Sequence, residues 1–210
     1  YSTISHIGFI LLSLAIISEQ SIDSFIFYII QYICTNLNIF LIIISISYII
    51  IKSIDSVKEN MNSLIKDISF ISELKNLFFS NPLIAISFSI CLFSMAGVPP
   101  LIWFFSKLYV LYSAVQDGYI FITFVCIIVS IISASYYLKI IKILFTRNNE
   151  LKSSNLFNAN KINNKVDLIV LSNFHAYLIA VLTLFILLFI LKSSLILNST
   201  QWLSLKYFFI

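Results

Sequence analysis

The sequence has 210 residues, of which 60% are hydrophobic and only 10% charged, with a formal net charge of +4. Because average soluble domains carry about 25% charged residues, this composition excludes an ordinary soluble globule and indicates a polytopic membrane protein. The three cysteines lie in apolar runs without paired or metal-ligand spacing, which is typical of small buried residues. The sequence contains no phosphate-binding loop, catalytic triad, flavin fingerprint or metal cluster. We therefore expect neither a cofactor nor a metal ion in this chain.

Five apolar stretches predict an all-α membrane fold with five transmembrane helices, since about 20 apolar residues suffice to cross a bilayer. The predicted spans are residues 3–18, 25–51, 82–115, 119–145 and 168–191. The first span is short and carries His6 in a polar patch near its start. The second span contains the polar residues Gln31, Thr35, Asn36 and Asn38. These side chains are expected to form interhelical hydrogen bonds, with a polar pathway as the alternative.

Two segments between the spans are polar. Residues 54–78 place apolar side chains at three- or four-residue spacing, which predicts an amphipathic helix at the membrane surface or against a partner. Residues 146–167 are rich in asparagine and predict a loop. The two connections, residues 52–81 and 146–167, hold eight lysine and arginine residues, whereas Glu19, Asp23 and Asp117 fall on the opposite side. Basic residues favour the inner face, so both connections are expected on the cytoplasmic or matrix side.

The third span is interrupted, and this interruption organises our interpretation of the chain. Gly97, Pro99 and Pro100 lie in its middle, and proline should break or kink a helix just before it. Lys107 is the only charged residue of residues 82–115. Ionisable residues inside a membrane are rare and usually functional, although a lysine can also extend its amine towards the interface. A broken helix with one buried ammonium predicts an ion-transfer element.

Other candidates for proton transfer are Lys139 and His6. Lys139 lies six residues before the end of the fourth span, where uptake or release of protons and simple anchoring at the interface are both consistent with its position. His6 can titrate near neutral pH, although a lone histidine is more often structural. Tyr136 and Tyr137 could donate hydrogen bonds, and aromatic packing would explain them equally well.

Three motifs resemble the subunit 2 family of NADH dehydrogenase, an antiporter-like family of respiratory complex I. Residues 1–9, YSTISHIGF, resemble the AYSSISHxGY signature of the antiporter-like subunits. The sequence SNPL at 80–83, followed by LFSMAGVPPL at 92–101 and FFSK at 104–107, resembles the NP…FSLAGIPPLxGFxxK block. Residues 135–139, SYYLK, resemble a later YYLR/K element. The motifs cover three of the five predicted spans in the order that the family shows.

The resemblance implies half of an antiporter-like fold, corresponding to the tenth to fourteenth helices of the family. It makes Lys107 the proton-carrying lysine of a broken twelfth helix, places Lys139 near the matrix end of the thirteenth, and puts His6, the candidate relay, in the tenth. Trp103 departs from the family pattern, which has a glycine there. The resemblance further implies that the family's first repeat is supplied by a separate chain, as in a split mitochondrial gene, or that these residues are one portion of a longer polypeptide.

Together these features predict a proton-translocating membrane subunit of NADH:ubiquinone oxidoreductase, without redox chemistry of its own. The expected partners are the other membrane-arm subunits, a chain with the N-terminal half, and membrane lipids, but no nucleic acid. The resemblance and the bias towards Ile, Phe, Asn, Lys and Tyr, which is typical of an organelle genome, place it in the mitochondrial inner membrane. The alternatives are a cation/proton antiporter or membrane-hydrogenase subunit of the same superfamily, or a structural subunit that does not pump.

Overall fold

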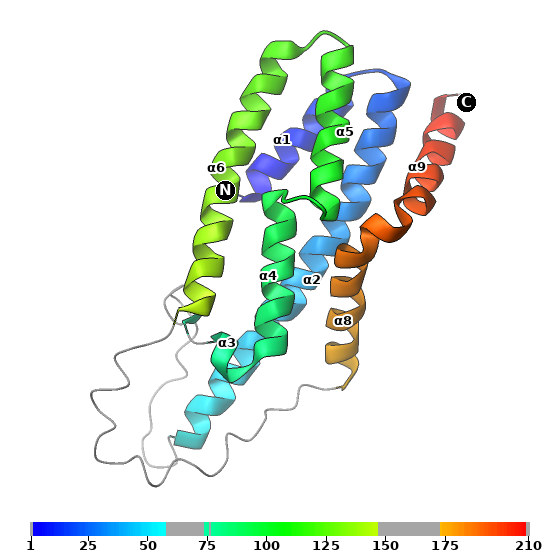
Figure 1. The fold of residues 1–210 in the computed structure, drawn as a ribbon. Helices are drawn as coiled ribbons and strands as arrows, with labels where there is room; N and C mark the ends of the chain where they lie inside the picture. Colours follow the sequence, from blue (N-terminus) through cyan, green and yellow to red (C-terminus); the bar gives the residue numbers. More distant parts are fainter. Residues whose placement is uncertain (1, 58–73, 76, 147–172, 209–210) are drawn as a thin grey trace.

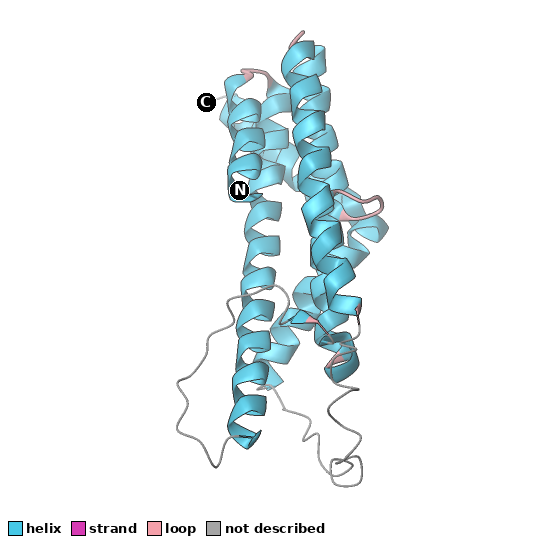
Figure 2. Ribbon diagram, turned by 90° about the vertical axis from the view of Figure 1, so that its left-hand side faces the viewer, coloured by secondary structure: helices cyan, strands magenta, loops and turns pink. Residues whose placement is uncertain are grey.

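The computed structural model describes residues 2–57, 74–75, 77–146 and 173–208, and every regular element in these ranges is helical (Figures 1 and 2). The elements are α1 (Ser2–Ala15), α2 (Glu19–Val57), α3 (Leu77–Ser80), α4 (Pro82–Ala96), α5 (Ile102–Gln116), α6 (Ile120–Phe145), α8 (Asn173–Leu188), the 3-10 helix η2 (Phe189–Lys192) and α9 (Ser193–Phe208). The prediction of an all-α fold is confirmed for this part of the chain.

The helices form an elongated bundle (Figure 1). Helices α2 and α6 run along most of its length, and two further columns are each made of two helices in succession, α4 with α5 and α8 with α9. The shorter α1 packs against α2, α5 and α6 in one half of the bundle. At that end, the Ser18 hydroxyl donates a hydrogen bond of 2.9 Å to the Asp117 carboxylate, which joins the α1–α2 and α5–α6 turns.

The described residues of each predicted span are helical, apart from residues at the ends and the interruption between α4 and α5. Helices α2 and α6 are long and apolar enough to cross a membrane, whereas α1, α4 and α8 are shorter apolar helices. The number of spans therefore stays a prediction. Residues 54–57 of the predicted amphipathic helix belong to α2 and residues 77–78 to α3, but residues 58–73 and 76 lie outside the described residues. The predicted loop also lies outside them, apart from Thr146.

The column made of α8 and α9 shows where the pattern of hydrophobicity was a poor guide. We predicted a span over 168–191, of which 168–172 lie outside the described residues. The residues after this span form the 16-residue helix α9, which packs against α2. The packing of α9 could not be predicted from hydrophobicity, because two of its inward-facing, buried residues are the polar Thr200 and Ser204.

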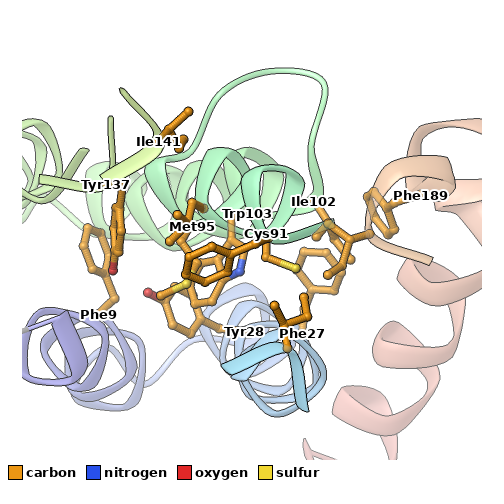
Figure 3. Close-up of a cluster of buried hydrophobic side chains, with 14 of the residues drawn as sticks. Phe9, Phe27, Tyr28, Cys91, Met95, Ile102, Trp103, Tyr137, Ile141 and Phe189 are labelled. Atoms are coloured by element: carbon orange, nitrogen blue, oxygen red, sulfur yellow. The ribbon is translucent and has the colours of Figure 1, made fainter. Parts of the chain in front are cut away.

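Aromatic side chains fill the centre of the bundle (Figure 3). Tyr28 of α2 and Trp103 of α5 are both fully buried, and their rings meet edge to face with centroids 5.1 Å apart. Phe27 of α2 contacts Phe189 of η2, with a centroid separation of 5.7 Å. This aromatic layer lies at the level where α4 gives way to α5, so it fixes the surroundings of the helix break.

Candidate functional site

The interruption of the third predicted span is a defined turn. Gly97 ends α4 in the left-handed conformation with φ 84°, which glycine adopts without steric cost. Its N–H donates to the Ser94 carbonyl at 2.8 Å, and Val98 N–H donates to the Phe93 carbonyl at 3.3 Å. Pro99 and Pro100 follow, and neither has an N–H to continue the helix. Helix α5 then starts at Ile102 and continues in the direction of α4 (Figure 1), so the predicted break is confirmed.

Lys107 lies beside this break and is buried, with 8% of its surface exposed. Its Nζ donates a hydrogen bond of 3.1 Å to the carbonyl oxygen of Met95, in the last turn of α4. Carbonyls in the last turn of a helix have no intrahelical partner, and they carry the negative end of the helix dipole. The break therefore supplies a buried amine with an acceptor that a continuous helix would not offer.

Lys107 also reaches a groove between α5 and α6. This groove has a volume of about 620 Å³ and is lined mainly by apolar side chains, together with Lys107 and Gly97. A Cβ atom added at Gly97 would stand 3.3 Å from Lys107 Nζ. The missing side chain of Gly97 thus leaves room for the amine at the edge of the groove.

His6 is almost completely buried, with 1% of its surface exposed. Its Nδ1 is hydrogen-bonded to the Tyr28 hydroxyl at 3.0 Å, and its Nε2 to the Tyr137 hydroxyl at 3.3 Å. The Ser2 hydroxyl is in turn hydrogen-bonded to Tyr137. The structure therefore places His6 at the centre of a hydrogen-bonded cluster that joins α1 to α2 through Tyr28 and to α6 through Tyr137.

Trp103 packs directly on His6, with ring centroids 4.4 Å apart. With its amide oxygen turned towards α5, Gln31 accepts hydrogen bonds from the Trp103 backbone N–H at 3.0 Å and from its indole N–H at 3.1 Å. The backbone N–H is one of those at the start of α5 that lack an intrahelical partner. Gln31 therefore caps α5 and fixes the ring that covers His6.

The polar residues of the second predicted span have two different roles. Gln31 forms the interhelical hydrogen bonds expected of it, and Asn38 Nδ2 donates to Cys91 Sγ of α4 at 3.1 Å. The Thr35 hydroxyl instead donates to the Gln31 carbonyl of its own helix at 2.9 Å. The prediction of interhelical hydrogen bonds is confirmed for Gln31 and Asn38, whereas the Thr35 hydroxyl forms its hydrogen bond within α2.

Lys139 lies apart from this cluster. Its side chain is exposed, and it lines a hollow near the end of α6 with Lys75 and Lys142. Tyr137, two residues earlier in α6, turns inwards to His6. Sequence reasoning left Tyr137 open between packing and hydrogen bonding, and it did not single out Tyr28. A buried tyrosine hydroxyl needs a hydrogen-bond partner. This requirement was the signal that could have linked Tyr28 and Tyr137 to the buried imidazole of His6.

The sequence matches a known family. The family model described as "NADH:quinone oxidoreductase/Mrp antiporter, TM" matches residues 1–133. The chain belongs to this family. This match, together with a relative that covers the whole chain, confirms the resemblance drawn from the three motifs and with it an antiporter-like, multi-pass membrane protein.

Individual relatives agree with this assignment. The chain is 40% identical over its whole length to NADH-ubiquinone oxidoreductase chain 2 of Rhizopus oryzae, covering 41% of that protein. It is also 40% identical to NADH-quinone oxidoreductase subunit N of a Wolbachia strain, over 69% of this chain and 27% of the relative. A chain of the Mrp complex from Dietzia superposes over 95% of this chain and 40% of its own, with TM-score 0.68 and 22% identity, which shows a common fold. The chain spans about two fifths or less of the length of these relatives.

Proposed function

We propose that the chain is the proton-translocating C-terminal portion of a subunit 2 of NADH:ubiquinone oxidoreductase in the mitochondrial inner membrane. The observation that carries this proposal is the buried Lys107 amine, which is bound to the Met95 carbonyl exposed by the helix break. The similarity to the Rhizopus oryzae chain 2 over the full length of this chain supports the redox-coupled complex over a stand-alone antiporter.

In this proposal, Lys107 is the proton carrier. The Met95 carbonyl can accept a hydrogen bond from either the ammonium or the neutral amine, so the side chain stays in place when its proton leaves. The groove beside Gly97 gives the amine an open side. His6 is the proposed relay, because its two nitrogens are hydrogen-bonded to the hydroxyls of Tyr28 and Tyr137. Lys139 remains a candidate for proton uptake or release at the end of α6.

The remaining helices of such a subunit, in the same polypeptide or in a separate chain, and the other membrane-arm subunits are the proposed partners. Native purification followed by mass spectrometry would test this. Copurification with subunits of complex I is expected, and recovery of either a second fragment or one longer polypeptide would decide how the first repeat is supplied. Copurification with a hydrogenase or an isolated antiporter would contradict the assignment to complex I.

The direct test of the mechanism replaces Lys107 in the assembled complex. Lys107→Met removes the titratable amine and keeps an unbranched side chain, so we expect fewer protons translocated per electron at a normal complex content. Lys206→Met is the matched control, because Lys206 is exposed in the last turn of α9 and should leave the ratio unchanged. An unchanged ratio in Lys107→Met would contradict the carrier role and favour a structural subunit.

A further inference from the structure

Three lysines line one hollow at the end of α6. Only one of them, Lys139, is a candidate for the proposed proton path. Lys75 precedes α3, whereas Lys139 and Lys142 lie in the last two turns of α6. Together with Ile143 and Thr146, they line a hollow of about 370 Å³. Lys139 and Lys142 are three residues apart and therefore share a face of the helix. The hollow thus concentrates three positive charges from two separate segments of the chain.

The packing of α3 against α6 holds this arrangement together. Phe78 of α3 and Phe145 of α6 place their ring centroids 4.8 Å apart, and the two helices are in contact. This aromatic pair fixes the segment that carries Lys75 next to the end of α6. Among the described residues, no carboxylate forms an ion pair with the three lysines. Like charges three or four residues apart on a helix destabilise it slightly, so an anion in the hollow would relieve their repulsion.

We propose that this hollow binds the phosphate headgroup of an anionic phospholipid. The surface beside it suits acyl chains, because the face of α6 that leads away from Lys142 presents Leu138, Ile131 and Phe124, all exposed. Phe124 lies 18 residues before Lys142 in the sequence, which corresponds to about 27 Å along a helix. A cationic hollow that continues into an apolar helix face fits an amphiphile, and basic pockets between membrane helices are suited to lipid phosphates. A free phosphate would use only the hollow.

The site can be tested by labelling the assembled complex in nanodiscs. The probes are phosphatidylglycerol and phosphatidylcholine with the same photoactivatable acyl chain, and labelled peptides are mapped by mass spectrometry. We expect phosphatidylglycerol to label α6 selectively. The double variant Lys75→Gln/Lys142→Gln should reduce this labelling by roughly 25-fold, because each lysine near a membrane surface strengthens binding to anionic lipid about fivefold. Lys139 is left intact, so the readout does not depend on the proposed proton path or on pumping.

Two controls separate binding from folding. Lys75→Arg/Lys142→Arg keeps the charges and should retain the labelling, and Lys206→Gln, which alters an exposed lysine on α9, should leave it unchanged. Equal labelling by the two lipids, or labelling that persists in the double glutamine variant, would overturn the proposal. Displacement of the probe by millimolar inorganic phosphate, but not by sodium chloride of equal ionic strength, would assign the hollow to free phosphate and would also overturn it.

Discussion

Gly97 and Gly118 offer a matched pair of substitutions that isolates the contact between the helix break and Lys107. Both glycines end a helical segment with nearly the same left-handed backbone, at φ 84° and 85°. A Cβ atom at Gly118 would meet nothing within 4 Å, whereas a Cβ atom at Gly97 would stand 3.3 Å from Lys107 Nζ. Gly97→Ala and Gly118→Ala therefore impose the same backbone penalty, and only the first disturbs the buried amine.

The size of the common penalty follows from the backbone. A left-handed conformation costs a residue with a Cβ atom about 1–2 kcal/mol, and reduced freedom of the unfolded chain offsets about 0.4–1 kcal/mol of it. Each variant should therefore lose about 1 kcal/mol of stability. In Gly97→Ala, the amine must also move by a few tenths of an ångström away from the new methyl group. Its hydrogen bond to the Met95 carbonyl, now 3.1 Å long, would lengthen or reorient.

The assay compares the two variants as assembled complexes in proteoliposomes. Thermal unfolding should show similar losses of stability, because the backbone penalty is shared. The number of protons translocated per electron should fall in Gly97→Ala and stay at the wild-type value in Gly118→Ala. Equal ratios in the two variants, whether both normal or both lowered, would refute the reasoning that Gly97 makes room for the working position of Lys107.

Three further predictions concern the surroundings of His6. Trp103→Ala empties a fully buried site and should destabilise the protein by about 3–5 kcal/mol. Trp103→Phe loses mainly the indole hydrogen bond to Gln31 and should cost about 1–2 kcal/mol. Equal unfolding temperatures of the two variants would contradict this order. Gln31→Leu leaves both Trp103 donors without this acceptor and should cost about 1–3 kcal/mol in the same unfolding assay. Tyr137→Phe removes the hydroxyl next to His6 Nε2 and should lower proton translocation, measured in proteoliposomes, while the exposed Tyr119→Phe should not.

The sequence was most informative where a local covalent property decides the structure. Pro99 and Pro100 have no N–H, so a break before them could be predicted without knowledge of any neighbour. Lys107 stood out because it is the only charge of a long apolar stretch. Helix α9 shows the opposite case. Its composition is too polar to predict a helix that packs in the bundle, and only its contact with α2 explains why Thr200 and Ser204 are buried.

Partners across the bundle could not be predicted in the same way. Tyr137 reaches His6 over 131 positions of sequence, and no spacing rule relates residues on different helices. Trp103 was noted only as a departure from a family glycine. The structure explains how the larger side chain is accommodated, because Gln31 accepts both of its N–H groups and His6 packs on its ring. Such compensation is a property of three helices together.

The helix break and Lys107 depend on each other. A buried ammonium without a partner is costly in an apolar core, and an open helix end inside a membrane is costly for the same reason. Here one hydrogen bond meets both needs, because the Lys107 amine donates to the Met95 carbonyl in the last turn of α4. An ammonium has three donors, yet among the described residues Nζ donates only this one hydrogen bond, while Gly97 and the groove leave another side of the amine open. The residue is thus held from one direction and accessible from another, and the proposed role as a proton carrier requires both.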